Sequence, residues 1–244
     1  MSPQYYIGTS GWHYDHWQGK FYPEKLAKAD WLEFYARHFN TVELNNTFYR
    51  LPSENAFQIW YKSSPADFVF AVKASRFITH IKRLKDKQPL DTFLTRAQGL
   101  KEKLGPVLYQ LPPNMHRNDD RLESFLSVLP KDIRHVFEFR HGSWLDEGVF
   151  SILHKYNAGL CVFDMPDFTC PVLATADFAY IRFHGRLWLY SSRYSDEEMA
   201  DWAKKLAELA SSANLKAVYI YFNNDAEAYA VENAVTLRSY LERK

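Results

Sequence analysis

Short apolar runs recur along the chain, and each run ends in polar or charged residues. Eight such junctions read, in chain order, TSGW, VELNNTF, VKASR, YQLPP, FEFRHGSW, VFDMP, IRFHG and YFNND. A chain that repeats a strand, a polar loop and an amphipathic helix about eight times over ~250 residues is typical of a TIM barrel. The pattern therefore predicts an α/β fold of the (β/α)8 type, with its functional site at the carboxyl ends of the strands.

Helix signals lie between these runs. Asp30 with Glu33, and Ser195 with Glu198, have the spacing of a capping box, so we expect one helix to begin at each place. Apolar residues at helical spacing predict further helices over 91–105, 118–129 and 228–241. Gly105-Pro106 is expected to end the first of these just before the next strand.

The sixth crossover breaks the pattern. Residues 165–177 carry Pro166 and Pro171 and show no helical stripe of apolar positions. We therefore expect a barrel whose sixth helix is eroded or missing.

Composition agrees with one such domain over residues 1–244. The 244 residues are 47% hydrophobic and 17% aromatic, and no linker-like segment divides them. The 30 basic and 29 acidic residues leave a net charge of +1, which recommends neither nucleic acid nor an anionic membrane as the main partner. The two cysteines form no metal-binding pattern, and the chain enters a strand at once without a signal segment, so we expect a cytoplasmic protein.

Alternation along each strand assigns side chains to the barrel lumen. In HVFEFR, Phe137 and Phe139 suit the layer against the helices, which turns Glu138 and Arg140 inward. Cys161 is expected to face the helices. The same interpretation places these side chains in the lumen: Ser10, Glu43, Asn45, Lys73, Gln110, Asp164, Arg182, His184, Tyr221 and Asn223.

Such a cluster predicts a ligand site, because each buried polar group without a partner costs about 1 to 3 kcal/mol. A purely structural network is the alternative. Three acids and three permanent bases can neutralise one another as a polar plug above the packed barrel core. We favour a site, since polar residues at strand ends usually serve one in this fold.

The motifs GTSGWHYDHWQGKFYP, TVELNNTFYRLP, FVFAVKASRFITH, VLYQLPP, FEFRHGSW, YIRFHG and VYIYFNND occur in this order along nearly the whole chain. This series resembles that of the YecE-like family, a domain of unknown function (number 72). The resemblance implies a TIM-type barrel and supplies no established reaction. It marks these signature positions: Gly8, Ser10, Gly11, Trp12, Glu43, Asn45, Phe48, Tyr49, Lys73, Gln110, Glu138, Arg140, Trp144, Arg182, His184, Gly185, Asn223 and Asn224.

Our leading hypothesis is an enzyme that acts on a polar, anionic, ring-bearing small molecule, such as a sugar phosphate or a nucleotide derivative. The forked donors of Arg140 and Arg182 suit phosphate or carboxylate, and aromatic faces can stack on sugars or bases. The expected substrate-binding residues are Ser10, Trp12, Asn45, Tyr49, Gln110, Arg140, Trp144, Asp164, Arg182, Tyr221 and Asn223.

The expected catalytic residues are Glu43, Glu138, Lys73 and His184. The two glutamates form an acid/base pair and His184 is a second proton carrier. Lys73 serves as an electrophile or as a Schiff-base nucleophile. Hydrolase, isomerase and lyase chemistry all remain open at this stage, and so does the oligomeric state.

Two further classes of function stay open as alternatives. Glu43, Glu138, Asp164 and His184 could bind a divalent metal, as in barrels that isomerise sugars or cut damaged DNA, but the neighbouring cations oppose this, and we expect no metal or other cofactor. The loop GRLWLYSSRYS alternates Arg186 and Arg193 with Trp188, Tyr190 and Tyr194, which favours single-stranded nucleic acid. The balanced net charge argues against that partner.

The first loop, residues 11–30, is long for a strand-to-helix connection and rich in aromatic residues, among them Trp12, Trp17 and Tyr22. It is either a lid over the barrel mouth or an aromatic plug that packs permanently on the rim. The sequence does not choose between the two.

Overall fold

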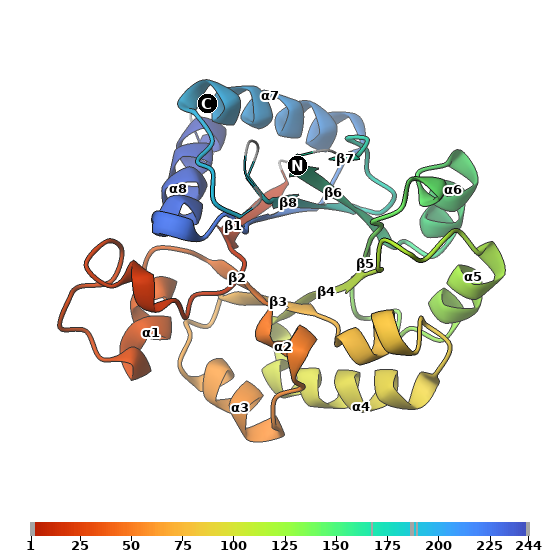
Figure 1. Ribbon diagram of the computed structural model, residues 1–244, viewed down its shortest axis with the longest axis horizontal. Helices are drawn as coiled ribbons and strands as arrows, with labels where there is room; N and C mark the ends of the chain where they lie inside the picture. Colours follow the sequence, from red (N-terminus) through yellow and green to blue (C-terminus); the bar gives the residue numbers. More distant parts are fainter. Residues whose placement is uncertain (1–2, 167, 186–187, 189, 243–244) are drawn as a thin grey trace.

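Eight parallel strands form a nearly closed barrel in the computed structural model, which describes residues 3–166, 168–185, 188 and 190–242. Hydrogen bonding joins them in the order β1-β9-β8-β6-β5-β4-β3-β2. Figure 1 shows the strands as a ring with the helices outside it. The strands are β1 (Gln4–Thr9), β2 (Thr41–Leu44), β3 (Val69–Lys73), β4 (Leu104–Gln110), β5 (His135–Glu138), β6 (Gly159–Met165), β8 (Phe178–Phe183) and β9 (Ala217–Phe222). The predicted TIM-type barrel is confirmed, and it forms a single domain.

Helices follow most of the strands and cover the outside of the barrel. They are α1 (Trp31–Ala36), α2 (Asn46–Tyr49), α3 (Glu54–Lys62), α4 (Lys87–Ala97), α5 (Asp119–Ser127), α6 (Glu147–Lys155), α7 (Asp196–Ser212) and α8 (Tyr229–Glu242). Short 3-10 segments span Asp15–Trp17, Lys28–Asp30, Gln98–Lys103, Gly142–Trp144 and Ala226–Ala228, and a π-helical turn spans Phe77–Ile81.

The sixth crossover carries no helix in its described residues. Its only regular element there is the two-residue strand β7 (Phe168–Thr169), which pairs antiparallel with the end of β6. The predicted loss of the sixth helix is thus confirmed.

The predicted helix signals have mixed outcomes. The capping box of Ser195 and Glu198 forms at the start of α7. The helix predicted to begin at Asp30 is confirmed, since α1 starts at Trp31, but the capping box does not form there. Asp30 ends a 3-10 turn that runs directly into α1, and its side chain makes no capping bond. The helix expected over 91–105 ends earlier, at Ala97, and Gly105 lies inside β4.

The core has two layers, and strand alternation separates them correctly in most strands. Phe70, Phe137 and Ile181 pack between the sheet and the helices. The smaller cluster inside the barrel consists of Ala71, Leu108, Val136, Cys161, Ala176, Phe178, Tyr180, Ala217, Tyr219 and Tyr221. The assignment of Cys161 to the helix side is wrong, because β6 presents the opposite alternation to the one we predicted.

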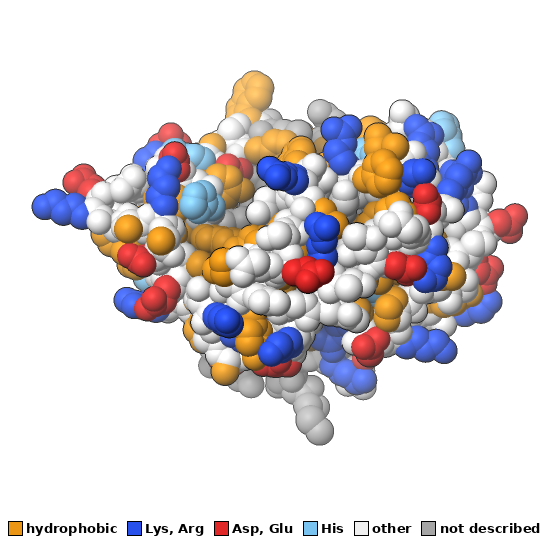
Figure 2. Space-filling view, turned by 90° about the horizontal axis from the view of Figure 1, so that it is seen from below, with side chains coloured by type: hydrophobic (Ala, Val, Ile, Leu, Met, Phe, Trp, Pro, Cys, Tyr) orange, Lys and Arg blue, Asp and Glu red, His pale blue; other side chains and the backbone are white. Residues whose placement is uncertain are grey.

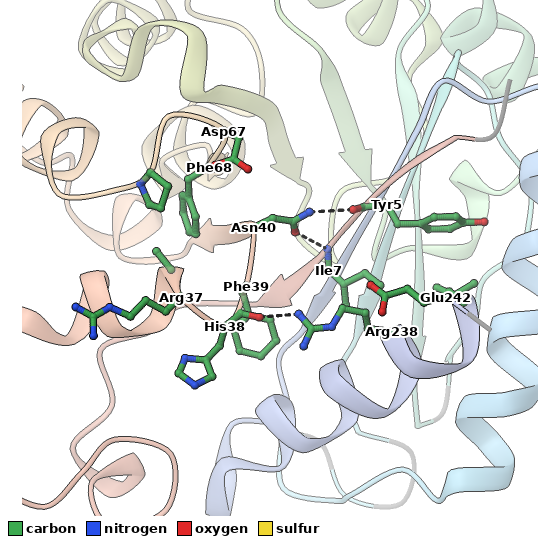
Figure 3. A pocket seen from close by; sticks show the side chains of 13 residues that line it. Tyr5, Ile7, Arg37, His38, Phe39, Asn40, Asp67, Phe68, Arg238 and Glu242 are labelled. Atoms are coloured by element: carbon green, nitrogen blue, oxygen red, sulfur yellow. Dashed lines mark hydrogen bonds between the residues drawn. The ribbon is translucent and has the colours of Figure 1, made fainter. Parts of the chain in front are cut away.

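Side chains close the seam between β1 and β2, where the regular ladder is missing. The Asn40 amide accepts from the backbone N–H of Ile7 at 3.3 Å and donates to the carbonyl of Tyr5 at 3.1 Å, as Figure 3 shows. Deeper in the seam, the Tyr35 hydroxyl accepts from the N–H of Thr9 at 2.9 Å. Gly8 permits the close approach, since a Cβ there would lie 2.2 Å from the carbonyl oxygen of Thr41.

The first loop packs as a plug. Trp17 is fully buried and donates its indole N–H to the carbonyl of Asp225 at 2.9 Å, which ties this loop to the one after β9. Tyr22 stacks on Trp31 with ring centroids 4.6 Å apart. This packing matches the second of the two alternatives for this loop.

Candidate functional site

Strand ends bring the predicted charges together at the carboxyl end of the barrel. Lys73 and Glu138 are the last residues of β3 and β5. Glu43 and Arg182 each lie one residue before the end of their strands, β2 and β8. Arg140 lies two residues after the end of β5, and His184 follows directly after β8. The alternation of a strand turns these side chains to one side, and the closure of the barrel makes that side common to all of them.

Arg182 is the centre of this cluster. Its guanidinium donates to Glu43 Oε1 at 2.8 Å through Nη2 and to Glu138 Oε2 at 2.6 Å through Nη1. All three side chains are fully buried. Arg182 therefore links the second and fifth strands across the lumen by two charge-assisted hydrogen bonds.

Glu43 accepts two further hydrogen bonds. Oε1 also accepts from the Ser10 hydroxyl at 2.8 Å, and Oε2 accepts from the Tyr180 hydroxyl at 2.6 Å. Ser10 and Glu43 in addition form the one parallel bridge between the ends of β1 and β2 in the described chain. This carboxylate is held in place from three sides.

Glu138 is bound by two arginines. Oε1 accepts from the guanidinium of Arg140, while Oε2 accepts from Arg182. Burial by itself would raise the pKa of Glu138, but the charges of Arg140 and Arg182 outweigh it and hold the pKa well below its usual range. Glu138 is therefore ionised at neutral pH.

His184 is neutral in these surroundings. Burial and the charge of Arg182 lower its pKa well below the usual value. Its Nε2 lies 3.0 Å from Arg140 Nη2 and 3.3 Å from Arg182 Nη1. Because an arginine can only donate, Nε2 is the acceptor and Nδ1 carries the proton. Asn223 Nδ2 lies 3.1 Å from Nδ1, so the Asn223 amide must turn to present its oxygen as the acceptor of that proton.

Lys73 differs from the other charged groups because its ammonium has no hydrogen-bond or ion-pair partner among the described residues. The side chain is only 8% exposed, and Nζ lies 4.4 Å from the centre of the Phe48 ring. Burial and the charge of Arg182 lower the pKa of Lys73 to about 8, against the opposite effect of the two glutamates. Of the groups in the cluster whose pKa is shifted, Lys73 has the pKa nearest to neutral pH.

The rim above this cluster contains Arg140 and Asn45. The guanidinium of Arg140 lies 4.8 Å from the Phe163 ring centre, and its side chain keeps an exposed fraction of 11%. Asn45 Oδ1 is buried without a hydrogen-bond partner, and so is Nε of Arg182. Gln110 lies beside Glu138 in the β4–β5 register. Two buried polar atoms thus lack a hydrogen-bond partner, and Arg140 keeps a small exposed fraction at the rim.

The two remaining predicted aromatic residues of the rim differ in exposure. Trp12 is nearly buried and packs edge-on against Trp60. Tyr49, in α2, is 76% exposed. Tyr49 is therefore free to meet a ligand, whereas Trp12 belongs mainly to the packed first loop.

Three predicted substrate-binding residues do not reach the mouth. Trp144 is fully buried on the outer face, where it stacks on Phe139 and donates to the carbonyl of Met115. Tyr221 faces the lumen but lies in the inner core, with its hydroxyl 2.7 Å from Thr41 Oγ1. Asp164 points the other way, since its Oδ1 accepts from the Tyr194 hydroxyl at 2.9 Å.

Sequence reasoning missed two residues of the site. Tyr180 shares the alternation of Arg182 two positions later, so its place beside Glu43 was open to prediction from the same argument. Phe163 supports Arg140 and lies 6.4 Å from His184 between ring centres. It was missed because the polar neighbour Asp164 was assigned to the lumen.

The structure gives the two alternative functions limited support, since Trp188 and Tyr190 of the nucleic-acid loop are exposed but the other features that these functions need are not found among the described residues. No three His, Cys, Asp or Glu residues of the described chain are grouped closely enough to hold a metal. Arg193 pairs with Asp196 and Glu232, Tyr194 is buried, and Arg186 lies outside the described residues. Cations and anions are interspersed on the face in Figure 2. No described helix has both the length and the apolar character needed to span a membrane.

Comparisons with known proteins give consistent matches. The family model "Protein of unknown function DUF72" matches residues 6–244. The UPF0759 protein YunF of Bacillus subtilis (strain 168) is 29% identical, over 97% of this chain and 94% of YunF. The UPF0759 protein YecE of Escherichia coli (strain K12) is 34% identical, over 59% of this chain and 51% of YecE. The crystal structure of a DUF72 family protein from Thermotoga maritima MSB8 has a TM-score of 0.89 at 31% identity and covers 98% of this chain and 100% of that chain.

Proposed function

This chain belongs to the DUF72 family of proteins of unknown function, as its motif series predicted, and we propose that it is an enzyme. It binds a polar, anionic, ring-bearing small molecule, such as a sugar phosphate or a nucleotide derivative, at the carboxyl end of the barrel. It then moves a proton on that molecule by acid/base chemistry.

The observation that carries this proposal is the unpaired ammonium of Lys73. The buried cluster contains three cations, Lys73, Arg140 and Arg182, against two carboxylates, Glu43 and Glu138, so its formal charge is 3 − 2 = +1. An excess buried charge is costly unless a partner compensates it. An anionic substrate is such a partner, and it would enter beside the partly exposed edge of Arg140.

The same surroundings redistribute the roles that we expected from sequence. Glu138 is bound by two arginines and ionised, and the protonation of neutral His184 is opposed by the same arginines. Lys73, with a pKa of about 8, is the group best suited to exchange a proton near neutral pH. Glu43 and Glu138 then position the arginines, Arg140 binds the anion, and Tyr49 supplies an exposed aromatic face.

A thermal-shift screen tests the anion site. The panel contains sugar phosphates, nucleotides and organic acids, and each compound is tested on the wild type, on Arg140→Gln and on Arg193→Gln. A ligand at about 100 times its dissociation constant adds about 2.7 kcal/mol, which raises the midpoint by roughly 5 to 10 °C in a chain of this size. We expect the shift in the wild type and in Arg193→Gln, and its loss in Arg140→Gln.

Arg193 is the matched control because it is an exposed arginine whose ion pairs lie away from the cluster. A shift that persists in Arg140→Gln would place the anion elsewhere and contradict the proposal. No shift with any compound class would favour the alternative of a polar plug without a ligand.

A further inference from the structure

Two lysines are buried in the described chain, and they differ in one respect. Lys103 donates to the carbonyls of Tyr61 at 2.6 Å and Ser64 at 2.7 Å, and to the Ser64 hydroxyl at 3.0 Å. All three protons of its ammonium therefore have acceptors, which is what a structural lysine requires. Lys73 has no such acceptor among the described residues, and its Nζ lies 4.4 Å from the centre of the Phe48 ring.

The groups around Lys73 oppose its charge on balance. Burial and the charges of Arg182 and Arg140 lower the pKa of Lys73, whereas Glu138 and Glu43 raise it. The lowering effects are the larger. From the π-helical turn, His80 packs edge-to-face against Phe48, with ring centroids 5.1 Å apart. Burial and the charge of Lys73 lower the pKa of His80 to about 4, so His80 is neutral and cannot act as a counter-ion.

A buried amine in a cationic environment is the arrangement that activates lysine as a nucleophile, because the neutral form has a free lone pair. The remaining 8% exposure of Lys73 is at the barrel mouth, where the ends of β3 and α2 meet. Arg140 lies in the same cluster and could fix a negatively charged group of the same molecule.

On the basis of the proposed function, we propose that Lys73 Nζ forms a Schiff base with an aldehyde or ketone that also carries a phosphate or carboxylate. The neutral amine attacks the carbonyl carbon and a C–N bond forms. The carbonyl oxygen then leaves as water with both amine hydrogens, so that a C=N bond replaces the C=O bond without oxidation or reduction. The substrate class is thereby narrowed to anionic carbonyl compounds, including sugar phosphates in their open-chain form.

Reductive trapping tests this covalent step. The wild-type protein is incubated with dihydroxyacetone phosphate, with pyruvate or with uncharged dihydroxyacetone, each with sodium cyanoborohydride, and the modified lysines are mapped by mass spectrometry. We expect Lys73 to be labelled at least tenfold faster than Lys103 and the exposed lysines at pH 8. Labelling of Lys73 rises with pH around its pKa of about 8, whereas exposed lysines follow only near their usual pKa of about 10.5.

Dihydroxyacetone phosphate and dihydroxyacetone form a matched pair, because they differ only in the phosphate group. Faster labelling by dihydroxyacetone phosphate or by pyruvate than by dihydroxyacetone identifies the anion that the site prefers. In Arg140→Gln, the rate at which the charged ketone labels Lys73 should fall to the rate of the uncharged ketone. The Lys73→Met variant should lose this adduct, and the internal comparison with other lysines of the wild type does not depend on the folding of any variant.

The outcomes separate the covalent step from the anion site. If Lys73 is labelled no faster than exposed lysines while phosphate compounds still stabilise the wild type but not Arg140→Gln, the Schiff base is refuted and the anion site stands. Rapid labelling of Lys73 with no preference for charged ketones supports the nucleophile and refutes the anionic substrate class. Slow labelling together with no thermal shift refutes both.

Discussion

Arg182 is the residue on which the polar interior depends most. It is fully buried and supplies a cationic partner to two carboxylates that come from strands on different parts of the ring. Breaking a buried ion pair by removing one partner leaves an uncompensated charge, which costs much more than the pair itself contributes. Arg182 therefore affects folding first, and Arg140 is the better residue for ligand experiments.

The variant Arg182→Met should lower the free energy of unfolding by about 3 to 5 kcal/mol, because it leaves Glu43 without a cationic partner in a buried position. Urea denaturation followed by circular dichroism measures this loss. Arg140→Gln is the control and should lose less, since Glu138 keeps its bond to Arg182. Equal and small losses in both variants would show that the carboxylates find other partners.

Glu138 should govern the reactivity of Lys73. Its negative charge raises the pKa of Lys73, so the neutral variant Glu138→Gln should move that pKa below its value of about 8. The measurement is the pH dependence of reductive labelling at Lys73. Asp164→Asn is the matched control, because Asp164 points to Tyr194 and away from the cluster, and it should leave the profile unchanged. A profile that moves to higher pH in Glu138→Gln would reverse the sign of this coupling.

At the scale of elements, the caps of the helices differ in a way that a single residue can test. Ser195→Ala removes the side-chain acceptor at the start of α7 and should cost about 1 kcal/mol, or roughly 2 to 4 °C in the melting temperature. Asp30→Ala is the comparison, since Asp30 makes no capping bond at the start of α1. Melting curves that show the larger loss for Asp30→Ala would contradict the assignment of the caps.

Strand alternation predicted which side of the barrel a residue faces. The prediction was wrong where the residue chosen to set the alternation did not face the lumen. It placed Lys73, Glu138 and Arg182 correctly because the charged residue of each of these strands does face the lumen, as the interpretation assumed. In β6 nearly every residue is apolar, so the polar Asp164 was used to set the alternation, and this gave the wrong face. Tyr221 shows a second limit, because alternation gives the face and not the depth along the barrel axis.

Beyond the ends of the strands, alternation carries no information. Trp144 follows β5 by six residues and lies in a 3-10 turn that begins at Gly142, so its direction depends on the turn and on packing against Phe139. The pairing of the charges was also beyond prediction. Sequence identified the members of the cluster, but which carboxylate meets which guanidinium depends on distances across the lumen that only the closed barrel defines.

At the scale of the whole molecule, the balanced composition conceals the local charge of the site. The chain has a net charge of +1 in total, and the buried cluster by itself accounts for a formal charge of 3 − 2 = +1. Screening weakens exposed charges in water, whereas a buried excess acts at short range in a medium of low dielectric. The total charge therefore bears on binding to nucleic acid and membranes, whereas the buried excess of positive charge bears on the ligand of the site.

Buried histidines make the stability of the whole fold depend on pH. Burial lowers the pKa of His135 from 6.5 to about 4, and the surroundings of His184 lower its pKa well below 6.5. Below pH 6.5 the unfolded chain binds protons that the folded chain does not, so stability falls as the pH falls. Each such histidine contributes about 1.4 kcal/mol per pH unit within its window. Glu138, whose folded pKa is depressed, adds a loss in the same direction once the pH falls below its usual value of 4.5.

We therefore expect the free energy of unfolding to decrease between pH 6.5 and pH 4.5, reaching a slope of about 2.5 to 4 kcal/mol per pH unit near pH 5 from His135, His184 and the half-buried His80. Urea titrations at half-unit steps of pH measure this slope. His135→Gln should reduce the slope by up to one proton, about 1.4 kcal/mol per pH unit, because burial holds the ring of His135 neutral in the folded state against the opposite effect of its bond to the Pro130 carbonyl. A wild-type stability that stays constant from pH 6.5 to pH 4.5 would mean that the buried histidines take up protons in the folded protein, and the neutral state of His184 in the candidate site would fall with that result.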